Sequence, residues 1–107
     1  MKTLTARERR LGLHLSLDVS GKDAAGTPFT QTGRTLNISG GGVLFETPRR
    51  LLVGARLVLH IQIPLALRRH FGNRPLYRVR AVVCRVERFQ DEATSRVGAR
   101  FLGEIRE

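Results

Sequence analysis

The stretch Leu11-Gly12-Leu13-His14-Leu15-Ser16-Leu17-Asp18-Val19 decides the fold of this chain. Leucine and valine alternate in it with glycine or polar residues, and this two-residue period is typical of a β-strand with one buried face. A helix would instead repeat its apolar residues every three or four positions. The sequence therefore predicts a half-buried strand directly after the N-terminal segment.

Five further segments repeat this pattern, each bounded by glycine, proline or polar turn residues. We expect strands at residues 29–38, 43–47, 56–63, 77–89 and 95–102. Residues 65–73 have room for a helical turn, which Gly72 and Pro75 keep short. Six short strands without a long helix predict an all-β domain, either a sandwich or a barrel.

The strand expected at 77–89 carries the single cysteine of the chain, Cys84. Alternation places Arg85 on the same face as Val83 and Cys84 on the opposite face. A lone cysteine has no partner for an internal disulfide, which is typical of a reducing compartment. We expect Cys84 to have a structural role as a small apolar residue.

Length and composition fit one soluble domain. The chain has 107 residues, of which 41% are hydrophobic and 26% are charged. No apolar run approaches the roughly 20 residues that span a membrane, and the N-terminus lacks the apolar core of a signal peptide. We therefore expect a cytoplasmic protein without membrane insertion.

Positive charge dominates, because 19 Lys and Arg residues against nine Asp and Glu give a net charge of +10. All of the basic residues except Lys2 and Lys22 are arginine, whose planar fork pairs with phosphate and with the O6/N7 edge of guanine. An anionic ligand is one interpretation, and a solvated basic surface is the other. Aromatic residues make up only 6% of the chain, which argues against a nucleic-acid partner held by base stacking.

The segment Asn37-Ile38-Ser39-Gly40-Gly41-Gly42 lies between the second and third expected strands. A hairpin needs one or two glycines. A third permits close backbone approach and positive φ, so that successive N–H groups can point at one anion. Asn37 and Ser39 would add amide and hydroxyl groups on one face. The alternative is a bulge or barrel corner that needs glycine for packing alone.

A basic segment, Arg7-Glu8-Arg9-Arg10, precedes the first strand. Nothing in the sequence ties it down, so we expect a flexible basic arm at residues 1–10 and the folded domain at residues 11–107. The three arginines can pair with phosphate, grip guanine edges or stack on bases. Taken alone, the segment is equally typical of a frayed tail.

Together the two segments resemble the PilZ domain, a bacterial receptor module for cyclic di-GMP. That family has an RxxxR or RRxxR motif before its first strand and a [D/N]xSxxG motif at a strand-to-strand turn. Asn37, Ser39 and Gly42 match the second motif at every defined position, and Arg10 fits the last arginine of the first. Residues 42–47 and 97–101 also resemble PilZ segments, so the resemblance runs along the whole chain.

The resemblance implies a six-stranded antiparallel Greek-key barrel of the split-barrel type. It implies a receptor or adaptor for cyclic di-GMP that has no cofactor and performs no catalysis. Ordering of the arm around the ligand would signal to a bacterial protein partner. The implied ligand-binding residues are Arg7, Arg9, Arg10, Asn37, Ser39, Gly41 and Gly42.

The arginine motif departs from the family pattern at one position. Ala6 stands where RxxxR has its first arginine, and Arg7 occupies the second place of RRxxR. Either Arg7 or Arg9 takes the vacant role, or the chain is a degenerate PilZ domain that binds a protein without the nucleotide.

Catalytic patterns do not appear in the sequence. His14, His60 and His70 lack metal-ligand spacing, Ser39 has no plausible base, and there is no phosphate-binding loop of the Walker type. We therefore expect neither an enzyme nor a metal site.

Overall fold

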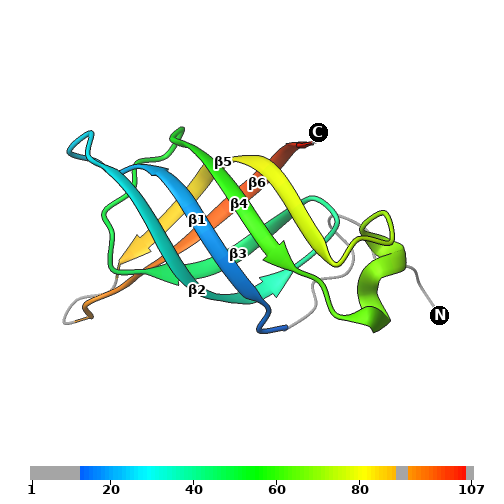
Figure 1. Ribbon diagram of the computed structural model, residues 1–107. Helices are drawn as coiled ribbons and strands as arrows, with labels where there is room; N and C mark the ends of the chain where they lie inside the picture. Colours follow the sequence, from blue (N-terminus) through cyan, green and yellow to red (C-terminus); the bar gives the residue numbers. More distant parts are fainter. Residues whose placement is uncertain (1–12, 89–91, 106–107) are drawn as a thin grey trace.

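Six antiparallel strands close into a barrel in the computed structural model, which describes residues 13–88 and 92–105 (Figure 1). The strands are β1 (Ser16–Lys22), β2 (Pro28–Ile38), β3 (Gly42–Thr47), β4 (Arg56–Gln62), β5 (Leu76–Arg88) and β6 (Ser95–Glu104). Their order around the barrel is β1-β2-β3-β6-β5-β4, and pairing of β1 with β4 closes it. The all-β barrel predicted from the sequence is confirmed.

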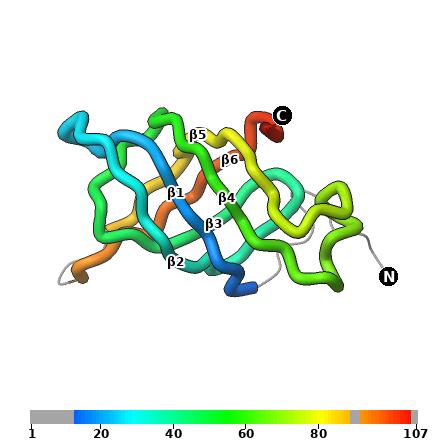
Figure 2. The backbone as a smooth tube through the Cα atoms, in the orientation of Figure 1, coloured from blue at the N-terminus to red at the C-terminus, as the bar shows by residue number. Residues whose placement is uncertain are grey.

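The path of the chain is a Greek key. The consecutive strands β4, β5 and β6 form a meander, and β3 lies beside β6 rather than beside β4. Strands β1, β2 and β3 form a second meander. Figure 2 shows the connection between β3 and β4, which joins the two meanders at one end of the barrel. The 3-10 helix η1 (Leu65–His70) lies at the opposite end. It is the only helix in the described part of the chain, and it is far too short to cross a membrane.

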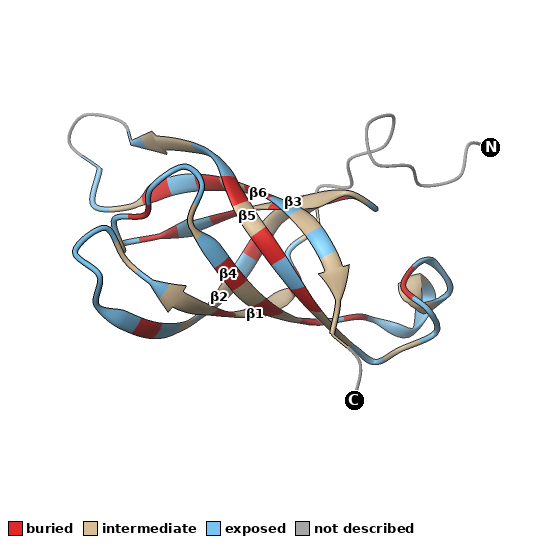
Figure 3. Ribbon diagram, turned by 90° about the horizontal axis from the view of Figure 1, so that it is seen from above, coloured by how far each residue is buried: buried red, intermediate tan, exposed pale blue. Residues whose placement is uncertain are grey.

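Apolar side chains fill the inside of the barrel. Buried residues recur at every second position along much of the strands (Figure 3). Val19, Leu59 and Val79 pair directly across β1, β4 and β5 and form one layer of this core. Burial of each such side chain contributes about 1.5–3 kcal/mol. Leu51 from the β3–β4 connection and Phe71 after η1 add buried side chains from the two ends.

The first strand begins later than alternation predicts, at Ser16. Residues 13–15 are instead held beside β2 by Thr35, which is completely buried. Its Oγ1 accepts the Leu15 N–H at 2.9 Å and donates to the Leu13 carbonyl oxygen. Residues 11 and 12 of the expected strand lie outside the described residues. Thr35 therefore fixes the point at which the N-terminal segment joins the barrel.

A β-bulge in β2 resets the alternation just before the glycine turn. Pairing with β3 shifts between Thr35 and Asn37. Simple alternation would turn Asn37 inward with Thr35, whereas in the structure Ile38 is buried and Asn37 is half-buried. The bulge thus re-aims the Asn37 side chain toward the outer surface.

A second bulge lies in β5, where pairing with β6 shifts between Val83 and Arg85. The prediction that Arg85 shares a face with Val83 is therefore wrong, because the bulge turns Arg85 outward. Cys84 lies on the face opposite Val83, as alternation predicts, but it is exposed, which does not fit the structural role expected of a small apolar residue. Val86 instead packs against the core.

Candidate ligand-binding site

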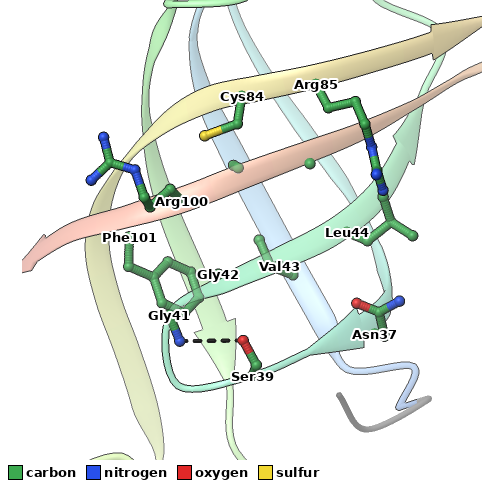
Figure 4. Close-up of a pocket in the computed structure, with 12 residues that line it drawn as sticks. Asn37, Ser39, Gly41, Gly42, Val43, Leu44, Cys84, Arg85, Arg100 and Phe101 are labelled. Carbon is green, nitrogen blue, oxygen red and sulfur yellow. Dashed lines mark hydrogen bonds between the residues drawn. The ribbon is translucent and has the colours of Figure 1, made fainter. Parts of the chain in front are cut away.

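A hollow of about 700 Å³ lies over β3, β6 and β5, beside the β2–β3 turn (Figure 4). Small-molecule sites typically have volumes of roughly 300–1,000 Å³. Four of the residues predicted from the sequence line it together: Asn37, Ser39, Gly41 and Gly42. The predicted arm residues Arg7, Arg9 and Arg10 lie outside the described residues.

Sequence reasoning missed the wall that β5 and β6 contribute to the hollow. Its residues are Cys84, Arg85, Gly98, Ala99, Arg100 and Phe101. The signal that could have found this wall was weak. Residues 97–101 resemble a PilZ segment, but the bulge that brings Arg85 outward beside Cys84 leaves no mark in the alternation of β5.

Two glycines leave the floor of the hollow without side chains. Leu44, Gly98 and Arg85 pair across β3, β6 and β5 and form one outward-facing row. Gly42 and Arg100 belong to the next outward row. Because glycine has no side chain, a ligand can approach the backbone closely at Gly42, whereas the Arg85 side chain passes over Gly98.

Gly42 is also required by packing. A Cβ atom at this position would lie 2.6 Å from the carbonyl oxygen of Ala99, so only glycine lets β3 approach β6 this closely. The expectation of positive φ in this turn is wrong. The glycines with positive φ in the described chain are Gly26, Gly54 and Gly72.

Hydrogen bonds dock the turn against β6 and occupy two of its N–H groups, those of Ser39 and Gly41. The Ser39 N–H donates to the Gly42 carbonyl at 2.9 Å, and the Phe101 N–H donates to the Gly41 carbonyl at 2.9 Å. The Gly41 N–H donates to Ser39 Oγ at 3.2 Å. These two N–H groups are therefore not available to an anion without breaking the turn, and side chains must supply part of the donors.

Asn37 and Ser39 bring polar groups to the rim of the hollow. The Asn37 amide points toward Leu44 (Figure 4) and makes no hydrogen bond to another described side chain or backbone group. The Ser39 hydroxyl accepts one hydrogen bond from Gly41, which leaves its own hydrogen available to a ligand. Both groups can therefore contact a polar molecule without breaking the fold.

The charge of the hollow suits an anion. Arg85 and Arg100 are its only charged lining residues in the described chain, and both are basic. Fixed charge of one sign around a cleft attracts ligands of the opposite sign. His, Cys, Asp and Glu side chains of residues 13–88 and 92–105 do not gather in threes, so these ranges offer no metal-binding cluster.

Comparison with known proteins agrees with the barrel fold. Residues 5–107 match the family model described as the PilZ domain. The fold is similar to that of the inhibitor of motility MotI/DgrA of Bacillus subtilis, with a TM-score of 0.70 and 18% identity, over 98% of this chain and 46% of that one. It is also similar to the PilZ domain with c-di-GMP of YcgR from Escherichia coli, with a TM-score of 0.58 and 20% identity, over 90% of this chain and 76% of that one.

The chain thus spans about half the length of MotI. A comparison with curated protein sequences finds no match. PilZ domains are generally cyclic di-GMP receptors or adaptors and not enzymes. The family match covers nearly the whole sequence and the barrel has the corresponding architecture, so this chain belongs to the PilZ domain family.

Proposed function

We propose that this domain is a receptor for cyclic di-GMP, bound in the hollow over β3, β6 and β5. One observation carries the proposal: Asn37, Ser39, Gly41 and Gly42 line a single hollow whose charged lining residues, among those described, are arginines. Cyclic di-GMP has two phosphates and two guanines, which arginine recognises by charge and by its planar fork. The Asn37 carbonyl can accept from the Watson–Crick edge of guanine, and the Ser39 hydroxyl can donate.

The N-terminal arm begins close enough to reach this ligand. Leu13 is held on Thr35, which precedes Asn37 by two positions in β2. Arg10 lies three positions before Leu13 and Arg7 lies six positions before it, which allows reaches of about 10 Å and 20 Å. We propose that Arg7, Arg9 and Arg10 close over the bound nucleotide and that this rearrangement is the signal to a protein partner.

Calorimetry at near-physiological salt tests the proposal. The wild type is expected to bind cyclic di-GMP, and Arg10→Ala and Ser39→Ala are each expected to weaken binding. Loss of one charge-assisted hydrogen bond lowers affinity by about 10- to 100-fold, and loss of the neutral Ser39 contact costs less. Arg50→Ala, an exposed arginine in the β3–β4 connection, is the matched control. Absence of binding heat when the wild type is titrated with cyclic di-GMP would contradict the proposal.

The single cysteine offers an independent measurement of where the ligand lies. Cys84 is exposed and lines the hollow. Saturating cyclic di-GMP should therefore slow the reaction of its thiol with a disulfide reagent such as Ellman's reagent. An unchanged rate under saturation would place the ligand elsewhere on the protein.

A degenerate domain that binds only a protein is the second candidate. Ala6 in the arginine motif favours it, as does the outer surface of β6, where the apolar side chain of Leu102 is 40% exposed. Capture of a partner by the Arg10→Ala/Ser39→Ala variant, with no calorimetric response to nucleotide, would support this function. Capture that requires cyclic di-GMP would defeat it.

A further inference from the structure

We propose that Arg85 recognises the O6/N7 edge of a guanine in the bound cyclic dinucleotide, an inference that rests on the proposed function. Neither the arm motif nor the Asn37–Gly42 turn includes this strand. Arg85 becomes part of the site only because the bulge in β5 turns it out of the barrel beside the hollow.

Gly98 determines the course of the Arg85 side chain. The two residues pair across β5 and β6. A Cβ atom added to Gly98 would lie 3.7 Å from Arg85 Cβ and 4.0 Å from its Nε, so the arginine stem passes directly over the glycine. Figure 4 shows the side chain pointing from β5 across β6 toward Leu44 and Asn37. A larger residue at 98 would obstruct this path.

The Arg85 guanidinium is only weakly engaged by the protein. Its Nε lies 4.0 Å from Glu87 Oε2, the outer limit of an ion pair, and both side chains are about half exposed. Exposed pairs of this kind contribute little to stability and are easily exchanged for a better partner. The guanidinium can therefore turn its N–H groups to a ligand at small cost.

The position of the guanidinium favours a base edge over a phosphate. The Arg85 stem lies over Gly98 along the outer face of β6, in the layer that a flat ring bound over the neighbouring outward row, at Gly42, would occupy. From that layer an arginine presents its fork to the edge of the ring. Guanine offers the acceptors O6 and N7 there, a geometry that fits the fork and that lysine cannot reproduce. Arg85, a residue of the barrel, would thus replace the arginine of the family motif at whose position this chain has Ala6.

A double-mutant cycle between protein and ligand tests this contact. Calorimetry compares the wild type, Arg85→Ala and Arg85→Lys with cyclic di-GMP and with its analogue in which carbon replaces N7 of both guanines. We expect Arg85→Ala to weaken cyclic di-GMP binding by about 10- to 100-fold. Arg85→Lys should lose nearly as much, because charge without the fork is insufficient. Arg50→Ala is again the matched control, and thermal unfolding verifies that each variant is folded.

Coupling between the two changes is the decisive result. If Arg85 contacts N7, the analogue should bind more weakly than cyclic di-GMP to the wild type but almost equally to Arg85→Ala. Independent, additive losses would overturn the inference and indicate a phosphate contact. Wild-type affinity in Arg85→Ala would overturn it while leaving the proposed function intact. Absence of binding by the wild type would overturn both.

Discussion

Thr35 joins the N-terminal segment to the barrel through one buried hydroxyl. It accepts from the Leu15 N–H and donates to the Leu13 carbonyl. Thr35→Val keeps the shape of the side chain but leaves both backbone groups without this partner. We expect a loss of about 1–3 kcal/mol in the free energy of unfolding, measured by urea denaturation.

The same substitution should weaken cyclic di-GMP binding, because the arm would lose its fixed starting point. Thr30→Val is a suitable control, since Thr30 lies on the same strand but is exposed. Its hydroxyl bonds only to the Ser20 hydroxyl among the described residues. The effect of Thr30→Val on stability should stay within about 0.5 kcal/mol. Equal effects of the two substitutions would contradict the role given to Thr35.

Tyr77 gives the barrel a dependence on alkaline pH. It packs edge-on against Phe71 and Phe101, with ring centroids 5.1 and 5.6 Å away. Burial raises the pKa of the Tyr77 hydroxyl above its ordinary value of 10.0, and the charge of Glu104 raises this pKa further. The resulting stability is fully present below the unfolded pKa and is lost as the pH rises through the folded pKa.

Tyr77 is the only tyrosine in the sequence, so ultraviolet absorbance follows its ionisation directly. We expect the folded protein to titrate at higher pH than the urea-unfolded chain. Tyr77→Phe should remove this part of the decline in unfolding free energy at alkaline pH. Identical titration curves for folded and unfolded protein would contradict the assignment.

At the scale of the strands, substitutions at Gly42 and Gly98, which both line the hollow, should have opposite effects on stability. Gly42→Ala forces a Cβ atom to within 2.6 Å of the Ala99 carbonyl oxygen, so β3 must move and stability must fall. Around Gly98 the near atoms belong to the flexible Arg85 side chain. Gly98→Val should therefore fold at least as stably as the wild type, because glycine inside a strand is unfavourable by about 0.5–1 kcal/mol.

The informative measurement is a comparison of stability with binding in these two variants. Gly98→Val should lose affinity for cyclic di-GMP despite its stability, because the new side chain obstructs both the floor and Arg85. Denaturant unfolding and calorimetry on the same samples separate these effects. Full affinity in Gly98→Val would show that the ligand does not rest on β6.

Alternation was sufficient to predict the six strands, because Leu17, Leu59 and Val79 lie at positions of the spacing that a half-buried strand requires. The choice of a barrel over a sandwich came from the resemblance to the PilZ family. Alternation could not predict the bulges. A bulge depends on how two strands register over a distance, and no residue in 83–85 announces it. For this reason Asn37 and Ser39 were found from the sequence through their motif, whereas Arg85 and Arg100 were found only in the structure.

At the scale of the whole molecule, the net charge of +10 attracts anions in general. Salt separates general attraction from specific binding. Cyclic di-GMP affinity should fall only a few-fold between about 50 and 300 mM salt, since few phosphates are neutralised. Affinity for duplex DNA should fall far more steeply, because each neutralised phosphate releases a counterion. DNA binding that persists at the higher salt and displaces cyclic di-GMP would make nucleic acid the partner.

The ladder between β1 and β4 also limits how another protein can attach. Every described strand has hydrogen-bonded neighbours on both sides over part of its length, so an incoming extended peptide finds no strand whose whole edge is unpaired. Recognition by a partner must therefore depend mainly on side chains of the outer barrel surface and on the loops. Substitutions on that surface away from the hollow can change the partner while the backbone ladder, and with it the nucleotide site, stays the same.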